Sequence, residues 1–381
     1  MSRSLSSLPP EPAAETVASR LRAVAQFLRR ALPLCQAHTV EFYTRGLWEQ
    51  LVALSPETVL EALSGAGLLR QQRPLEEAAG TARPGLWDNC KFSNVFCENS
   101  QKLVNVQFFA LAAKYHSLPS LEVCTPLDQM LGALSGKQHE RCGQLPDYCT
   151  GQHSMGRRDC IMVGLHTCGD LAPNTLRIFT AKPEIKAVCS VGCCYHLLTE
   201  EFENQKDCSP GLWGFPMCRY LKEEGWCCGR NARMSACLAL ERVAVSQVLP
   251  TESLFYRAVL QVIIEECYGV IKSDRHVGKI FSKSSSFVDY VRKSLKKLEL
   301  DETKLPDSCI MDYYEKYKHR MNELEAFNML KVVLAPCIEV LLLLDRLCYL
   351  KEKDNIAWSG LLKLFDPVKS PRCYAVVALK K

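Results

Sequence analysis

The segment from Ile161 to Val191 constrains the fold of this chain most strongly. "IMVGL" is a continuous apolar run of the kind found in a strand that is covered on both faces. "LAPNTLRIF" then has helical spacing, with Asp170 as its expected N-cap, and "IKAVCSV" is a second apolar strand. A strand, a helix and a strand within about thirty residues predict two parallel strands joined by a right-handed crossover.

Polar side chains follow each of these two expected strands. His166 and Cys168 come after the first strand, and Cys193, Cys194 and Tyr195 come at the end of the second. The carboxyl ends of parallel strands meet at one edge of a sheet, and ligands bind there. The sequence therefore predicts either a binding crevice at this edge or loop residues that pack under a helical region.

The chemistry of this edge is left open by the residues alone. A cysteine and a histidine could form a nucleophile and its base, but no third group that would orient the base is evident. Zinc ligands could come from His166, Cys168, Cys193, Cys194 and His196, yet no CxxC pair is present here. On this spacing we expect no metal.

The rest of the chain is mostly helical in pattern. We expect a helical N-terminal region over residues 1–134, a flexible polar connection over 135–158, and an α/β region over 159–381. The run after Pro371, from Cys373 to Leu379, predicts a last strand of the same sheet. The apolar run Met329–Leu350 contains several charged residues and Pro336, so we expect a buried core helix and no membrane span.

The cysteines and the N-terminus indicate a reducing compartment. The chain has 21 cysteines, including the adjacent pairs Cys193-Cys194 and Cys227-Cys228, and adjacent cysteines do not readily bond each other. The first twenty residues lack the apolar core of a signal peptide. We therefore expect reduced thiols and a cytoplasmic or nuclear location.

The charge of the chain permits an RNA partner without requiring one. The net charge is +5. A basic stretch around Arg292 and Lys293 could contact phosphates, although the low net charge favours a solvated helix face. Trp213, Phe215 and Trp226 could stack on a base, but their position between glycines and prolines is typical of local packing.

"VGLHTCGDL" followed by "SVGCCYHL" resembles the methyltransferase-like protein 25 family, as do "WGFPMCRYLKEEGWCCGRNARMSACLALERV" and "LFDPVKSPRCYAVVALKK". A more distant likeness is to a tRNA 2′-O-methyltransferase family. The resemblance implies a class I S-adenosylmethionine-dependent methyltransferase fold with RNA or protein as the methyl acceptor. It also implies two groups of candidate catalytic residues: His166, Cys168 and Asp170 at the reaction centre, and Cys193, Cys194 and Tyr195 beside the acceptor.

The chain departs from the family pattern in its cofactor-binding half. The family carries a glycine-rich loop after a first strand and an acidic residue after a second, both before the "GLHTCGD" strand. Here "SGAG", from Ser64 to Gly67, has no strand in front of it, and the stretch between Arg141 and Asp159 is too short for the missing units. An alternatively spliced product or an incompletely assembled gene would explain this departure.

We therefore expect an incomplete class I methyltransferase-like (Rossmann-like) parallel sheet. A helical N-terminal region should precede it, and a large helical insertion should come before the last strand. Cofactor-binding residues cannot be assigned from this sequence, and we expect S-adenosylmethionine to bind weakly or not at all. The alternative is a non-catalytic helical binding or scaffold protein that keeps part of the sheet.

Overall fold

The computed structural model describes residues 8–64, 94–131, 159–203, 212–238, 251–269 and 277–381. Its contacts divide the chain into two compact units, which differ from the linear division expected from the sequence. The sheet unit comprises residues 1–32, 113–242 and 334–381, and the helical unit comprises residues 33–112 and 243–333. The expected connection 135–158 lies outside the described residues.

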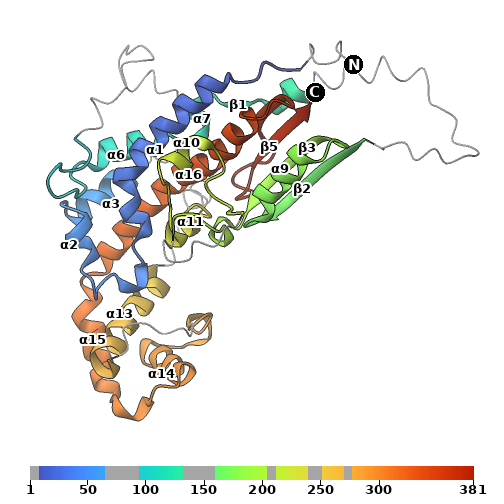
Figure 1. Cartoon of the computed structure of the whole chain (residues 1–381). Coiled ribbons are helices and arrows are strands. Elements are labelled where there is room, and N and C mark those ends of the chain that lie inside the picture. Colours follow the sequence, from blue (N-terminus) through green and yellow to red (C-terminus); the bar gives the residue numbers. More distant parts are fainter. Residues whose placement is uncertain (1–7, 65–93, 132–158, 204–211, 239–250, 270–276) are drawn as a thin grey trace, which may run out of the picture. The chain divides into compact units, whose positions relative to one another are not determined.

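The sheet unit is built on five strands in the order β1-β4-β5-β3-β2 (Figure 1). Their bounds are β1 Cys124–Thr125, β2 Cys160–Cys168, β3 Ile185–Cys193, β4 Ile356–Lys363 and β5 Tyr374–Lys380. β2 pairs with β3 and β1 with β4 in parallel, whereas β5 is antiparallel to both β3 and β4. The expected strand–helix–strand unit is confirmed, with α9 (Leu171–Ala181) as its crossover, and so is the last strand.

β2 is the outer strand of the described sheet, and its apolar residues are not covered as the sequence predicted. Ile161, Val163 and Leu165 alternate along one face, and their exposed fractions are 72%, 64% and 54%. β3 is β2's one partner in the described sheet. The prediction of burial on both faces was wrong because it assumed a further layer and a further strand, which the described residues do not provide.

α16 (Met321–Lys351) is the long core helix that the apolar run predicted. By length and composition this helix could cross a membrane, because an 18-residue stretch of it has a mean hydropathy of 2.0. However, 89% of that stretch is buried inside the protein. The helix continues through Pro336. Its second part lies in the sheet unit, where Leu341, Leu343 and Leu344 are fully buried.

Shorter helices complete the sheet unit and form the helical unit. The described helices besides α9 and α16 are α1 Ala14–Gln36, α2 Leu47–Leu51, α3 Pro56–Ser64, α6 Val106–Tyr115, α7 Leu118–Leu121, α10 Arg219–Glu223, α11 Arg230–Ser235, α13 Thr251–Tyr268, α14 Phe287–Leu298 and α15 Asp307–Lys318. In the helical unit, Tyr256 of α13 meets Phe287 and Tyr290 of α14 edge-on or tilted, at centroid distances of 5.0 and 5.4 Å. This aromatic contact gives the helical unit its own core.

Candidate functional site

Three thiols meet where β2 and β3 end. Cys168 is the register partner of Cys193, and Cys194 follows directly in the chain. The Sγ atoms of these three residues lie within 4.8 Å of one another, and those of Cys193 and Cys194 are 3.8 Å apart. The structure therefore brings together the cysteines that the sequence predicted at this edge of the sheet. No disulfide joins any cysteine of the described residues.

A bulge in β2 positions His166 beside these thiols. Gly164 pairs with Ser190 and Thr167 with Gly192, so Leu165 and His166 together oppose a single residue of β3. Bulges of this kind often re-aim a side chain next to an active site. The His166 side chain is exposed and lies close enough to Cys193 to act on the pKa of its thiol. The apolar pattern of the strand gave no signal of this bulge.

Thr167 stabilises the bulge from the buried side. Its hydroxyl donates to the carbonyl of Val191 (2.7 Å) and lies 3.0 Å from the hydroxyl of Ser190. A Cβ on Gly164 would lie 2.5 Å from the Thr167 methyl carbon, so only glycine fits there without displacing that side chain. The local sequence thus accommodates the irregular strand end.

The thiols of Cys168 and Cys193 differ in acidity. Burial acts to raise the pKa of Cys193, but hydrogen bonds from His166 and from the backbone of Cys194 bring it below its usual value. A hydrogen bond with Cys194, together with burial, raises the pKa of Cys168 to about 12. Cys193 therefore becomes a thiolate, the reactive form of cysteine, more readily than Cys168 does.

Cys194 has a backbone conformation that is rare for a residue with a side chain. Its φ is +24° and its ψ is 57°. Such conformations cost on the order of 1–3 kcal/mol and persist where surrounding structure holds them. Here the turn directs the chain away from β3 while keeping the Cys194 thiol next to that of Cys193.

Asp170 stands at the N-cap position of α9, but its side chain does not cap the helix as the sequence predicted. Its carboxylate instead accepts hydrogen bonds from the backbone N–H and the hydroxyl of Thr199, both at 2.8 Å. A Cβ on Gly214 would lie 2.0 Å from Asp170 Oδ1, so the second loop approaches the carboxylate closely. Asp170 therefore joins the two strand-end loops, and a role in chemistry stays a prediction.

Replacing Asp170 by alanine should lower the free energy of unfolding by about 1–2 kcal/mol, because two charge-assisted hydrogen bonds are lost from a half-buried site. Urea denaturation measures this change. The control is Asp159→Ala, which removes an exposed ion pair of 3.9 Å to Lys186 and should change stability by less than about 0.5 kcal/mol. Equal effects of the two substitutions would contradict the joining role of Asp170.

Tyr195 lies in the protein interior. It is 1% exposed, and its hydroxyl donates to Glu339 Oε1 at 2.9 Å. The guanidinium groups of Arg346 and Arg372 lie 5.6 and 5.1 Å from its ring centroid. Burial and the neighbouring Glu339 raise the pKa of the hydroxyl well above its usual value. These contacts give Tyr195 a structural role, and its predicted place beside an acceptor remains untested.

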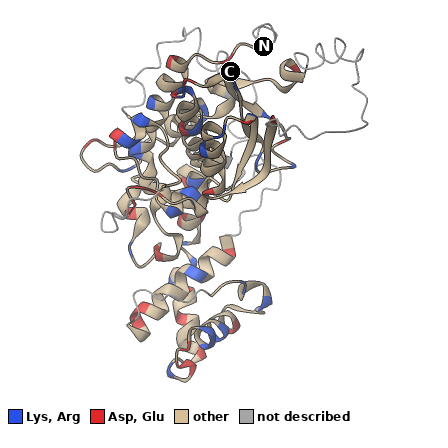
Figure 2. Cartoon of the chain, turned by 45° about the vertical axis from the view of Figure 1, so that its right-hand side comes forward, with Lys and Arg blue, Asp and Glu red and all other residues tan. Residues whose placement is uncertain are grey.

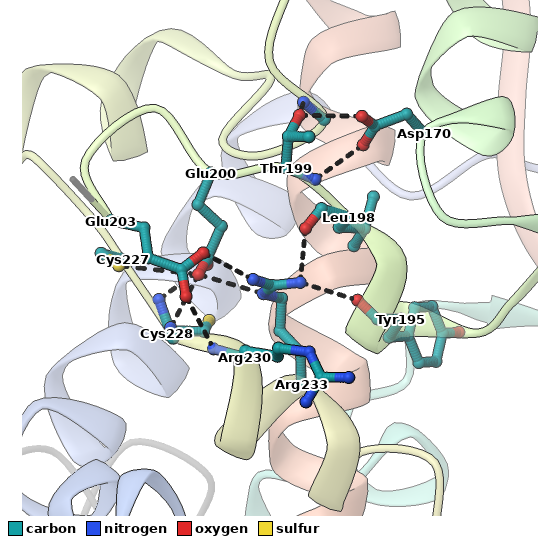
Figure 3. A network of polar contacts seen from close by, with 12 residues as sticks. Asp170, Tyr195, Leu198, Thr199, Glu200, Glu203, Cys227, Cys228, Arg230 and Arg233 are labelled. Carbon is teal, nitrogen blue, oxygen red and sulfur yellow. Dashed lines mark hydrogen bonds and ion pairs between the residues drawn. The ribbon is translucent and has the colours of Figure 1, made fainter. Parts of the chain in front are cut away.

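A buried ion-pair network supports the loop that follows β3 (Figure 3). Arg233 of α11 is 1% exposed and lies 3.0 Å from Glu200 and 2.7 Å from Glu203. It also donates to the backbone carbonyls of Tyr195 and Leu198. Glu200 in turn accepts from the backbone N–H groups at positions 228 and 229, at 2.8 and 2.7 Å. The network therefore holds the turn that begins at Cys194.

A second buried carboxylate, Asp345 of α16, binds the loop before α10. It accepts from the N–H groups of Met217 and Cys218 at 2.9–3.0 Å. Burial raises the pKa of Asp345 to about 6, against the lowering effect of these hydrogen bonds. The charged residues within the apolar run 329–350 were the sequence signal of such a buried site.

The raised pKa of Asp345 predicts a specific pH dependence. A carboxyl whose folded pKa lies above its unfolded value contributes stability below the unfolded pKa, and this contribution disappears as pH rises through about 6. The free energy of unfolding of the wild type, relative to Asp345→Asn, should therefore rise by up to about 3 kcal/mol as pH falls from about 7 to about 4. Denaturant titrations across this range measure the difference, and a constant difference would contradict the prediction.

The basic helix and the aromatic residues give little support for an RNA surface. In α14, Arg292 is paired with Asp307, and Lys293 with Asp289 at 2.7 Å. Phe215 and Trp226 are 1% and 4% exposed, so neither can stack on a base in this conformation. In the view of Figure 2, basic and acidic residues lie interspersed along the described helices. These observations favour a solvated helix face for the basic stretch and local packing for the aromatic residues.

Comparisons with known proteins place these motifs in a family. A family model described as "Methyltransferase domain" matches residues 70–201. The chain is 43% identical to "Probable methyltransferase-like protein 25" of Homo sapiens over 600 residues, covering 98% of this chain and 99% of that relative. It is 40% identical to the protein of the same name from Mus musculus over 594 residues, covering 98% of each. No solved structure matches.

The length of these alignments exceeds the length of the chain. An alignment over 600 residues contains many positions at which a chain of 381 residues has none. The relatives therefore have residues that this chain lacks. This difference agrees with the missing segment that the sequence predicted.

The described residues do not form the cradle that S-adenosylmethionine, the cofactor suggested by the family, would need. In doubly wound sheets of order 3-2-1-4-5, the nucleotide-binding loop follows the first strand, which pairs with the fourth. On the side away from β3, β2 has no partner among the described strands. Within the described ranges, no glycine-rich turn leads from a strand into a helix beside β2.

Proposed function

Because this chain belongs to the methyltransferase-like protein 25 family, we propose that it keeps the acceptor side of a methyltransferase sheet and transfers no methyl group unaided. S-adenosylmethionine is the methyl donor that the family suggests. The acceptor in this proposal is an RNA or a protein, in line with the sequence resemblance. The proposal separates two properties, acceptor binding and cofactor binding, that a complete enzyme combines.

The outer position of β2 carries this proposal. A first strand would pair along the open edge of β2, and the crossover helices of the missing half would cover its exposed face. Instead, Ile161, Val163 and Leu165 are more than half exposed. Apolar side chains in such a row are normally buried against neighbours. Their exposure is what removal of the adjoining half of the sheet would leave.

The acceptor side itself is well formed. His166 lies at the end of β2 beside Cys193, so it is our candidate to take a proton from an acceptor. Cys168 and Cys194 lie beside Cys193. Asp170, through Thr199, and Arg233, through the carbonyl of Tyr195, hold the two loops that carry these groups.

The second candidate function is a non-catalytic binding or scaffold protein. The same open β2 supports it, together with a helical unit that has its own aromatic core. The two candidates differ in what a restored chain would do. An acceptor side that has merely lost its cofactor half should regain transfer when that half is returned, whereas a scaffold should not.

The test compares this chain with a restored form to which the residues of the human relative that have no counterpart in this chain are added at their aligned positions. Each is incubated with S-adenosylmethionine labelled in its methyl group and with cellular RNA or protein. We expect label in the acceptor only with the restored form. In that form, His166→Ala should lower transfer at least about tenfold while leaving cofactor affinity nearly unchanged.

Two results would contradict the proposal. One is transfer by the present chain that His166→Ala abolishes, because the chain would then have its own cofactor site. The other is a folded restored form that binds cofactor and labels no acceptor, which would favour the scaffold function. Circular dichroism of each variant shows that it is folded.

A further inference from the structure

The cysteine cluster at the ends of β2 and β3 has the composition of a metal site. It contains three sulfur atoms from the ends of two strands. Soft thiolate ligands select ions such as Zn²⁺. The cluster residues are half-buried, and His166 is exposed, so an ion can reach the thiols from solvent.

The spacing of the sulfur atoms matches zinc coordination. A Zn–S bond is about 2.3 Å, so two thiolates at a tetrahedral angle lie about 3.8 Å apart. The Sγ atoms of Cys193 and Cys194 are 3.8 Å apart. All three sulfur atoms lie within 4.8 Å of one another, and a movement of about 1 Å brings the third into the same geometry.

We propose that Cys168, Cys193 and Cys194 bind one zinc ion and leave its fourth coordination position open. The register of β2 against β3 places Cys168 opposite Cys193, and the positive φ of Cys194 keeps its thiol next to that of Cys193. Both features of the strand ends thus serve one site. This inference is independent of the proposed function, because zinc binding is measured without a methyl donor.

The alternative uses of the thiols fit these observations less well. A catalytic cysteine needs one thiol and a base, and leaves two further sulfur atoms at this distance unexplained. Zinc binding uses all three sulfur atoms in one role.

The spacing argument from sequence did not detect this cluster. Adjacent cysteines and the absence of CxxC led us to expect no metal. The register pairing of Cys168 with Cys193 places ligands together that are distant in sequence. A ligand set drawn from two strands is visible only once their pairing is known.

The test uses the full chain, reduced with a phosphine, stripped with a chelator and dialysed. Zn²⁺ and then Co²⁺ are titrated against a chromophoric chelator. We expect one ion per chain, thiolate-to-cobalt charge-transfer bands in the Co²⁺ form, and three sulfur ligands at about 2.3 Å in zinc X-ray absorption. Cys168→Ser and Cys193→Ser should each weaken binding by at least about 100-fold, since even outer-shell changes weaken it 10–100-fold.

The matched control is Cys160→Ser, which removes an exposed thiol from the same strand. It should leave stoichiometry and affinity unchanged. Loss of the ion in Cys160→Ser to the same extent as in Cys193→Ser would show adventitious binding and overturn the site. So would a folded wild type without charge-transfer bands.

Discussion

Replacing Arg233 by methionine lowers the free energy of unfolding by about 3–5 kcal/mol in our account. Removing one partner of a buried ion pair leaves the other charge buried and without compensation. Arg233 is 1% exposed and Glu200 is 3% exposed, so the remaining carboxylate has no access to solvent. The carbonyls of Tyr195 and Leu198 also lose their donor. Natural domains have small free energies of unfolding, so a loss of this size is easy to detect.

Urea denaturation at neutral pH measures this change. The matched control is Arg45→Met, which breaks the exposed ion pair between Arg45 and Glu41 and should cost less than about 0.5 kcal/mol. Glu200→Gln in the Arg233→Met background should recover part of the loss, because it removes the unpaired charge. A cost below about 1 kcal/mol for Arg233→Met would contradict the supporting role of the network.

The sequence predicted those parts of the fold that depend on local pattern. The strand–helix–strand unit, the last strand and the buried α16 all follow from runs of apolar residues. β4 was missed because it follows α16 after only a few residues and contains Ser359 and Gly360, which weaken the strand pattern. β1 has two residues and no pattern at all.

The errors concern features that depend on distant neighbours. The exposure of the β2 side chains depends on whether other parts of the chain cover that face of the sheet. The residues of β2 alone cannot show this. Asp170 was expected to bond to its own helix, but Thr199 from the next loop competes successfully for its carboxylate. The bulge at His166 and the left-handed conformation of Cys194 have no composition signal, because neither involves a glycine at the irregular position.

The second large effect that we predict is on cofactor affinity. S-adenosylmethionine binding requires backbone that approaches the cofactor at a glycine-rich loop and a carboxylate that accepts from its ribose hydroxyls. Each desolvated polar anchor contributes on the order of 1–3 kcal/mol, and about 1.4 kcal/mol changes affinity tenfold. Loss of several such anchors should weaken binding by some orders of magnitude. Asp170 cannot replace the missing carboxylate while both of its oxygens are bound to Thr199.

Titration calorimetry of S-adenosylmethionine into the purified 381-residue chain tests the central claim most directly, with the restored form as the positive control. The restored form should bind one cofactor per chain. Our account predicts no saturable heat from the present chain at low micromolar cofactor. Saturable binding at one cofactor per chain, with an affinity close to that of the restored form, would show that this chain has a complete cofactor site and would contradict the account.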